Sequence, residues 1–359
     1  MATPNWVRVV NTTTKDYFKE EEVNILRNRK LTAILREKGR FRYNRGGTAM
    51  NFPVRYKRST MQGYADMESL TFPRVNRWKK GELGWRGYTM AEAMSKMERL
   101  QNKGAAQIID IWTEMIKGIK DDFDENFATE LYIDGNATAN VKRFHGIESF
   151  MGASASAGNL IATPNDSFAG LTTNLGTYGG TWTGTWPNGS GDDHYDFWSP
   201  LIVDYTNTGW DATTKTWPNT CLEVLRFGII QTQRNKSKKG ELDLILIDRE
   251  MYRKFLDRLD EKERIQTMRN ADNSLLIKLG FGSVTNFDGV DISWEYGSPV
   301  NVGYGFNCDM MEADSMQKTL FVVDGPEYDI TTKSWRLSLD CFGNCKWNPR
   351  HFMKLAAIS

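Results

Sequence analysis

The chain has 359 residues, enough for one large domain or two, and its 40% hydrophobic and 25% charged residues are typical of a globular protein. Its 46 basic and 45 acidic residues give a formal net charge of +1, which excludes a protein attracted to nucleic acid or to an anionic membrane by overall charge. No segment reaches the ~20 apolar residues that span a bilayer, and the first residues lack a secretory signal pattern. We therefore expect synthesis in the cytoplasm.

The first predicted element is a charged, thinly amphipathic helix over residues 17–38, followed by Gly39, a residue type that commonly ends helices. Its apolar stripe is too small for independent stability, so we expect it to pack on another part of the molecule. Residues 41–89 alternate in short segments broken by Gly, Pro and Asn, which predicts a long, strongly basic β-hairpin. Because an isolated hairpin is marginal in water, a neighbouring chain is expected to stabilise it.

The period changes after this hairpin. Apolar residues recur at threes and fours over 90–131, which predicts one long helix, with Gly104 as a candidate break. Loops dominate from 132 to 217, including the run GTYGGTWTGTWPNG at 176–189. Order returns over 219–299, where a compact α/β subdomain is predicted from a helix, a buried strand, a second helix and a hairpin, at 220–234, 242–248, 249–262 and 287–296. The last sixty residues alternate again and predict antiparallel strands.

No catalytic, cofactor or metal site is predicted. The glycine-rich run at 176–189 has no lysine and leads into more loop, so it does not fit a phosphate-binding loop. Metal ligation by the GDDHYD segment is chemically feasible, but a polar surface turn is favoured; its candidate ligands are Asp192, Asp193, His194 and Asp196. Cys341 and Cys345 share one face of a strand without a second zinc-ligand pair, so free thiols are expected, as for Cys221 and Cys308.

The sequence favours neither nucleophilic catalysis nor sugar binding. For nucleophilic catalysis the chain offers only His145, His194 and His351, without a recognisable nucleophile motif. Aromatic residues of the loop-rich region could stack on sugars, but rings that anchor irregular backbone are favoured; they are Tyr178, Trp182, Trp186, Tyr195, Trp198, Trp210 and Trp217.

The basic hairpin is the strongest candidate for a functional surface. Direct nucleic-acid binding is disfavoured because the rest of the chain is neutral. A contact between subunits explains both the charges and the exposed strands, with an acidic patch at 120–126 on the neighbour as the candidate acceptor. The candidate interface residues are Arg55, Lys57, Arg58, Arg74, Arg77, Lys79 and Lys80 on the hairpin, and Asp121, Asp122 and Asp124 on the acceptor.

The order of these elements, together with several short phrases, resembles the tailed-phage major capsid protein with the Hong Kong 97-like fold. The phrases are LYIDGN (131–136), FHGIESFM (144–151), TYGGTW (177–182), FDGVDISWE (287–295) and NPRHFMKLAAI (348–358). The resemblance covers nearly the whole chain and implies an α+β fold. It assigns an N-arm to 1–40, an extended hairpin called the E-loop to 41–89, a peripheral domain with the spine helix to 90–218, an axial domain to 219–299 and return strands of the peripheral domain to 300–359.

The resemblance implies a structural protein and not an enzyme. Copies would assemble as hexamers and pentamers into an icosahedral shell, with E-loops clasping adjacent subunits and with packaged double-stranded DNA inside, held by non-specific contacts. Scaffolding, portal and decoration proteins are the other implied partners, and no cofactor or membrane is implied. The protein would be assembled in the host cytoplasm and reside in the virion.

The sequence leaves open the source of scaffolding, a covalent Lys-to-Asn bond, and two alternative functions. Only about forty residues precede the hairpin, so scaffolding is expected from a separate protein unless this is a processed form. Some relatives form a Lys-to-Asn bond, for which the candidates are Lys57, Lys79 or Lys80 with Asn344 or Asn348. The alternatives are an encapsulin-like compartment shell and a Trp-rich carbohydrate-binding protein.

Overall fold

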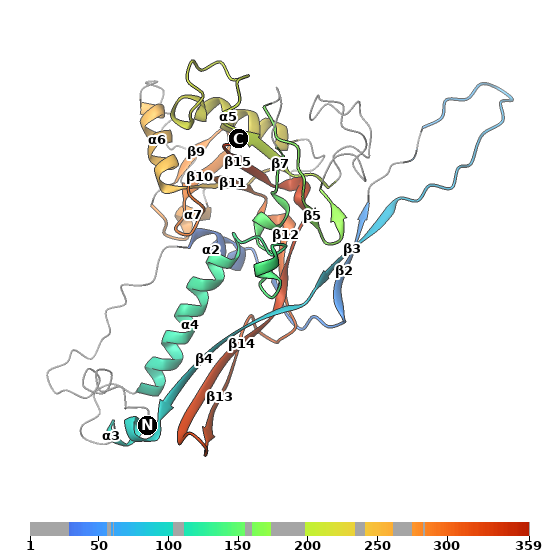
Figure 1. The fold of residues 1–359 in the computed structure, drawn as a ribbon. Helices are drawn as coiled ribbons and strands as arrows, with labels where there is room; N and C mark the ends of the chain where they lie inside the picture. Colours follow the sequence, from blue (N-terminus) through green and yellow to red (C-terminus); the bar gives the residue numbers. More distant parts are fainter. Residues whose placement is uncertain are drawn as a thin grey trace.

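The computed structural model describes residues 29–55, 59, 61–102, 111–154, 160–173, 198–233, 241–260, 275–282 and 284–358. A compact α/β body lies at one end, and a long helix runs from it beside long strands. A thin hairpin projects sideways from the middle (Figure 1). The molecule is therefore extended, with large surfaces away from its main core.

The α/β body contains a six-stranded sheet in the order β7-β15-β11-β8-β10-β9. Strand β8 is the sequence LILI, and all four of its side chains are buried. Alternate side chains of a strand point to opposite faces, so Ile245 and Ile247 pack with helices α5 and α6 while Leu244 and Leu246 join the core next to α4. The bounds are β7 (Leu201–Asp204), α5 (Trp217–Thr232), β8 (Leu244–Ile247), α6 (Arg249–Asp260), α7 (Leu275–Lys278), β9 (Thr285–Phe287), β10 (Val290–Trp294), β11 (Gly303–Phe306) and β15 (Met353–Ala356).

The helix, strand, helix and hairpin predicted for 219–299 are confirmed as α5, β8, α6 and the β9–β10 pair. The predicted boundaries nevertheless do not enclose this sheet. Strand β11 pairs with β8 and with β15, and β15 pairs with β7, so three of the six strands come from outside 219–299. Strand partners this distant along the chain leave no periodic signal in the sequence.

The second sheet is organised by β14 (Ser334–Trp347), whose buried and exposed residues alternate over most of its length. One edge of β14 pairs with β4 (Arg86–Ser95). The other edge pairs first with β13 (Val322–Asp329) and then with β12 (Met311–Ser315). Leu337, Leu339, Cys341 and Cys345 form the inner face, which shares a core with helix α4 (Ile111–Glu130). The antiparallel strands expected after residue 300 are confirmed here.

The prediction of one helix over 90–131 is wrong in its first part. Residues 90–95 belong to β4, the short helix α3 (Lys96–Gln101) follows, and α4 is described over Ile111–Glu130. Met90 and Met94 are four residues apart, a spacing that places side chains on one side of a helix and also on one face of a strand. The ten residue pairs between β4 and β14 show that this segment is a strand.

The β-hairpin expected over 41–89 is confirmed, but its paired strands span fewer residues than predicted. Its paired strands are β2 (Ala49–Arg55) and β3 (Trp78–Gly84). Residues 41–42 instead form β1 (Phe41–Arg42), which pairs in parallel with β12. We keep the name E-loop for residues 49–84.

The segment before the E-loop crosses the molecule, and we call residues 29–45 the strap. It begins with helix α2 (Lys30–Glu37), whose buried Leu31, Ile34 and Leu35 join the main core. It then continues into β1 at the edge of the second sheet. The helix predicted for 17–38 is thus found at its C-terminal end, and residues 17–28 lie outside the described part.

In the described residues of the loop-rich middle, 132–217, the strands are the two-residue β5 (Ser167–Phe168) and β6 (Leu171–Thr172) and the four-residue β7. Trp198, Trp210 and Trp217 are buried there, and each indole nitrogen donates to a backbone carbonyl. These three rings anchor backbone and are not a sugar-binding surface. The run at 176–189, its other aromatic residues and the GDDHYD segment lie outside the described residues.

Candidate subunit-contact surfaces

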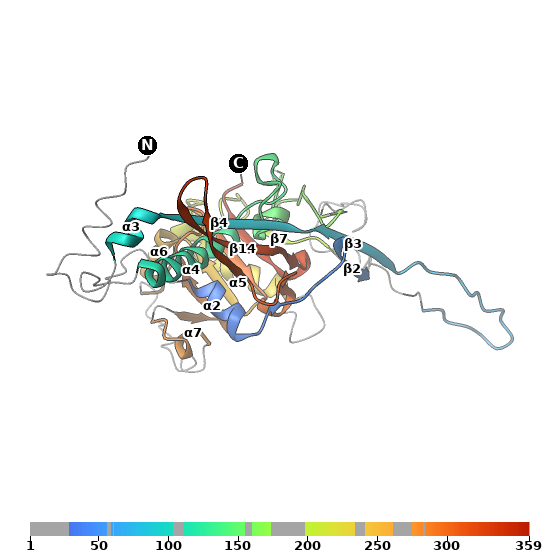
Figure 2. The same ribbon diagram turned by 90° about the horizontal axis from the view of Figure 1, so that it is seen from below.

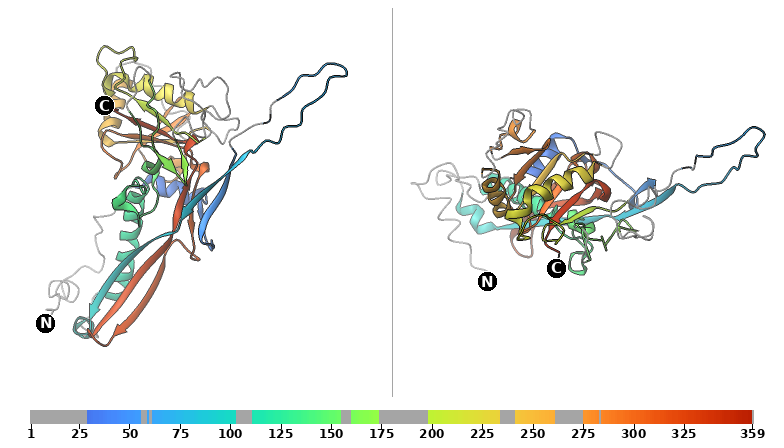
Figure 3. Two further views of the ribbon diagram at one scale, coloured as in Figure 1. Left: turned by 45° about the vertical axis from the view of Figure 1, so that its right-hand side comes forward. Right: turned by 90° about the horizontal axis from the view of Figure 1, so that it is seen from above.

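The E-loop projects away from the rest of the molecule in every view (Figures 2 and 3). Its base is anchored, because Met50, Val54 and Leu83 are buried and the Trp85 indole nitrogen donates to the Gly47 carbonyl at 2.8 Å. Its tip, residues 61–77, lacks such anchors. The side chains of Met61, Phe72 and Met67 are 92%, 91% and 98% exposed. Exposed large apolar side chains grouped in this way usually mark a binding surface.

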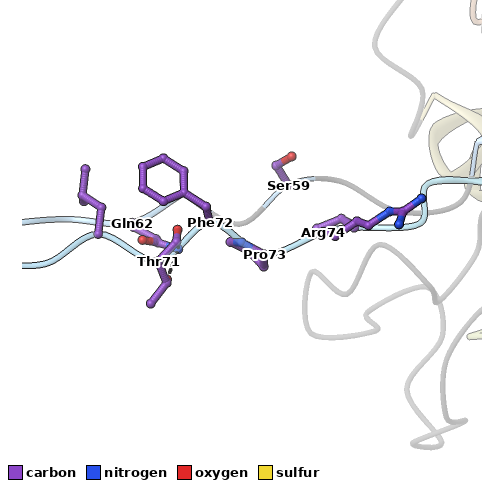
Figure 4. Close-up of a pocket in the computed structure, with 8 residues that line it drawn as sticks. Ser59, Gln62, Thr71, Phe72, Pro73 and Arg74 are labelled. Carbon is purple, nitrogen blue, oxygen red and sulfur yellow. Dashed lines mark hydrogen bonds between the residues drawn. The ribbon is translucent and has the colours of Figure 1, made fainter.

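A hollow of about 400 Å³ lies along this tip, between its two backbone traces. It is lined by Ser59, Gln62, Leu70, Thr71, Phe72, Pro73, Arg74 and Val75. The labelled side chains are spread along the loop and face in different directions (Figure 4). The hollow is therefore a consequence of the loop's shape and lacks the convergent polar groups of a ligand pocket.

The described cations of the E-loop are almost all exposed, as a contact surface requires. Arg55 and Arg74 form no ion pair within the described part of the chain. Arg77 donates to the Ser59 hydroxyl, and Lys80 pairs with Glu82 of its own strand at 2.8 Å. Lys79 is half-buried. Lys57 and Arg58 lie outside the described residues. The chain thus holds a basic surface with few acidic partners of its own.

The predicted acceptor on α4 is only partly available. Asp124 pairs with Arg36 of the strap. Asp121 and Asp122 are half-buried near the middle of α4, and the described residues give them no ion pair. Helix α4 lies apart from the projecting E-loop of the same chain (Figure 1), so a contact between the two would have to involve a second copy.

A second acidic surface, which the sequence did not reveal, lies on the outer face of the β4–β14–β13 sheet. Cross-strand partners share a face, and the register pairs Asp324 with Ser338, Glu327 with Arg336, and Val322 with Asp340. Asp329 pairs with Ser334 at the end of the hairpin and binds Arg336 at 2.6 Å. We call the four carboxylates the acidic face; they are Asp324, Glu327, Asp329 and Asp340, with Arg336 as the one cation among them.

The facing residues of β4 leave the acidic face open. Thr89, Ala91 and Ala93 are small and exposed, and they lie opposite Asp340, Ser338 and Arg336. Further along β14 the same face is covered, because Asn344 is buried and Lys346 lies 4.9 Å from the centre of the Phe52 ring. The accessible part is therefore a flat strip toward the β13–β14 turn.

Asn344, one candidate for the Lys-to-Asn bond, is hydrogen-bonded to other groups in the described structure, and candidate Lys57 lies outside the described residues. The Asn344 side chain is fully buried, where its amide nitrogen donates to the Gly84 carbonyl at 2.7 Å and its oxygen accepts from the His145 backbone at 3.0 Å. These bonds assign it a structural role. Asn348 is half-buried and remains untested.

Among the described candidates for catalysis, His145, His351 and the four cysteines are buried, and His194 lies outside the described residues. Burial lowers the pKa of His145 to about 4, so its ring is neutral and contacts Asn344. All four cysteines are free and buried, as predicted, and burial raises the pKa of Cys308 and Cys341 to about 12. Within the described ranges no group of three potential ligands could hold a metal ion, and no helix has the length and apolar character to cross a membrane.

No protein-family model matches the sequence, and no curated protein does. The fold, in contrast, has many matches among solved structures. The capsid of cyanophage A-1(L) matches with a TM-score of 0.61 and 13% identity, covering 99% of this chain and 98% of that one. The capsid of a native GTA particle matches with a TM-score of 0.58 and 12% identity, covering 96% of both chains.

The chain has the fold of a phage capsid protein. The α+β architecture and the resemblance to capsid proteins are therefore confirmed over nearly the full length. The SrpI encapsulin from Synechococcus elongatus PCC 7942 shares this fold, with a TM-score of 0.53, 9% identity, and coverage of 100% of this chain and 97% of that one. At such identities the likeness shows the fold alone.

Proposed function

We propose that this chain is a major capsid protein, whose copies assemble as hexamers and pentamers into an icosahedral shell enclosing phage DNA. The observation that carries the proposal is the near-complete overlap with phage capsid chains, at 96% or more of both chains. A match of this extent includes the extended parts as well as the compact body. We assign the protein a structural role and no catalytic one.

The physical form of the chain supports assembly. A single copy leaves the E-loop tip without a partner, although the tip carries exposed methionines and a phenylalanine. An isolated two-stranded hairpin is marginal in water, so a neighbour that covers it would add stability. Several such contacts per copy, each modest, would act together through effective concentration and close the shell.

We infer that the basic E-loop of one copy lies on the acidic face of the next. The two surfaces have opposite charge, since the acidic face has four carboxylates and one guanidinium. Arg74 and Arg77 are exposed on the tip, and Asp324 and Glu327 are exposed on β13. This acceptor is favoured over the acidic residues of α4, because Asp324 and Glu327 are exposed. Asp121 and Asp122 are half-buried, and Asp124 already pairs with Arg36. Opposite charges of this kind accelerate encounter and select the correct neighbour.

We also propose partners for the assembled shell, on the basis of the same overlap with phage capsid chains. Packaged double-stranded DNA would be contacted without sequence readout, and only weakly, because a net charge of +1 gives little overall attraction to its phosphates. Scaffolding, portal and decoration proteins would complete the particle, which is assembled in the host cytoplasm and matures into the virion.

The proposal is tested by light scattering and negative-stain microscopy of the purified chain, at low and moderate salt. We expect closed shells, or rings of five and six that coalesce into shells. A sugar-binding protein would instead remain a monomer whose tryptophan fluorescence changes with added oligosaccharide.

An encapsulin-like compartment is the second candidate, favoured by the match to the SrpI encapsulin over 100% of this chain. Shells purified from the native host distinguish the two. Nuclease-protected DNA inside supports the phage capsid, whereas a co-purifying enzyme cargo without DNA supports the compartment.

A further inference from the structure

The strap is held at its start by a buried cluster of charged residues. Lys30 is 2% exposed. Its amine donates to the Ser293 hydroxyl at 2.7 Å and to the Trp294 carbonyl at 2.8 Å. Arg29 pairs with Glu125 of α4. The strap is thus attached to β10 and to α4 at one point, where the six-stranded sheet meets the long helix.

Glu295 lies at the centre of this cluster and is 3% exposed. Its Oε2 accepts from the Leu31 backbone at 3.2 Å and from the Tyr132 hydroxyl at 2.9 Å. Its Oε1 is buried without a hydrogen-bond partner in the described structure. A buried carboxylate with one unpaired oxygen is costly, whereas a neutral carboxyl at the same place is much less so.

The surrounding titratable groups compensate only in part. Arg29 and Lys30 come from the strap. Glu125 lies on α4, and Tyr132 lies in the segment that follows α4. Tyr304 comes from β11, and its ring centre lies 5.6 Å from that of Tyr132. Tyr304 in turn donates to Glu148, which binds Lys354 at 2.8 Å. Within the described structure no cation donates a hydrogen bond to Glu295 Oε1.

We propose that Glu295 acts as a proton-responsive latch, which holds the strap more firmly on the junction between α4 and the six-stranded sheet when its carboxyl is protonated. The inference concerns a single chain and does not depend on the proposed shell. It gives the fold a conformational control at the point where its compact body joins its extended part.

The direction follows from proton linkage. Burial raises the pKa of Glu295 from 4.5 to about 7, despite the opposing effects of Tyr132, Leu31, Arg29 and Lys30. A raised pKa means that the contribution to docking is complete below the free value and is lost as pH rises through about 7. Between about pH 5 and about pH 8, the opening equilibrium of the strap should change on the order of tenfold or more.

The titration of Lys30 has the opposite effect on strap docking, but the effect is small between about pH 5 and about pH 8. Burial lowers its pKa from 10.5 to about 8, so its stabilising effect is present above the free value and is lost as pH falls through about 8. Below about pH 8 both docked and released amines are mostly charged, so its effect changes by only about twofold. The strap should therefore be least firmly held between the two pKa values, about 7 and about 8.

The test is hydrogen–deuterium exchange of the full chain at about pH 5 and about pH 8, corrected for intrinsic exchange and read on peptides of the strap. The β13–β14 hairpin, which does not contact Glu295, serves as the reference. In the wild type, strap protection should be on the order of tenfold or more higher at the lower pH. Equal protection at both values would overturn the proposal.

Two variants distinguish the latch from a general loss of stability. Glu295→Gln keeps an oxygen for Leu31 and Tyr132 without titrating, so its protection should change by no more than about twofold between the two pH values. Glu125→Gln removes an ion pair of the same strap and should lower protection at both pH values while leaving their ratio as in the wild type. A wild-type ratio in Glu295→Gln would overturn the proposal.

Tyr132→Phe provides a second route if Glu295→Gln does not fold. It removes a hydroxyl that favours the ionised carboxyl, so the midpoint of the pH dependence should move upward. An unchanged midpoint would assign the pH dependence to another group.

Discussion

The strap and the E-loop are both basic and extended, yet their charges are used differently. Four strap cations pair with carboxylates within the chain: Arg36 with Asp124, Lys38 with Asp243, Arg40 with Asp309 and Arg42 with Glu312. Arg55 and Arg74 of the E-loop have no such partner among the described residues. The strap thus holds one chain together, whereas the E-loop presents its charges to another.

Apolar side chains show the same contrast. Leu31 of the strap is fully buried, whereas Met67 of the E-loop tip is 98% exposed. A long side chain in water contributes nothing to the folding of its own chain, so its burial must come from a second molecule if it is to stabilise anything. Composition alone does not separate the two segments; pairing within the fold does.

The largest effect is expected from truncating the buried side chain of the strap. Leu31→Ala should lower the free energy of unfolding by about 2–5 kcal/mol, because it leaves a cavity in the main core. Met67→Ala, the matched change on the E-loop, should alter it by less than about 0.5 kcal/mol. Urea denaturation of the unassembled chain measures both. Similar losses in the two variants would contradict the contrast.

A smaller difference is expected between two arginines. Arg40→Ala removes a partly buried pair with Asp309, whose side chains are 23% and 25% exposed, and should cost about 1–2 kcal/mol of folding stability. Arg74→Ala should be within about 0.5 kcal/mol of the wild type. The same denaturation experiment compares them, and equal costs would show that Arg74 has an acceptor within its own chain.

Salt should give the smallest effect on folding and a clear effect on association. Raising the ionic strength well above ~0.1 M shortens the screening length below ~10 Å, so encounter between the E-loop and the acidic face should slow on the order of tenfold. Folding stability should change by less than about 1 kcal/mol, because the exposed strap pairs contribute little each. Stopped-flow light scattering and urea titrations at matched salt measure the two. Association that is insensitive to salt would argue for an apolar contact only.

Much of the compact body was predictable because its signals are local. The apolar run of β8 and the amphipathic pattern of α6 are visible in the sequence itself. The Asp288–Gly289 turn indicates the β9–β10 hairpin, and both of these turn residues have positive φ. What failed was any feature decided by distant partners. Met90 and Met94 fit a helix as well as a strand until β14 is known, and the strands that complete the six-stranded sheet come from both sides of 219–299.

The basic half of the contact surface was recognisable from the density of arginine and lysine along one segment. The acidic face was not, because Asp324 and Glu327 are three residues apart, a spacing that places side chains on opposite faces of a regular strand. A register shift between them puts both opposite outward residues of β14. Asp340 joins them only through pairing with β13, which the sequence does not specify.

The measurement that tests the account most directly is a charge-swap cycle, read by shell formation in negative-stain microscopy. Arg74→Glu with Arg77→Glu on the E-loop should abolish assembly, and so should Asp324→Lys with Glu327→Lys on the acidic face, without loss of folding. The chain carrying all four changes should assemble again, because every copy then presents both reversed surfaces. Asp121→Lys with Asp122→Lys is the matched control for the acceptor and should not restore the E-loop variant. Restoration by this control, or normal assembly of the E-loop variant alone, would contradict the account.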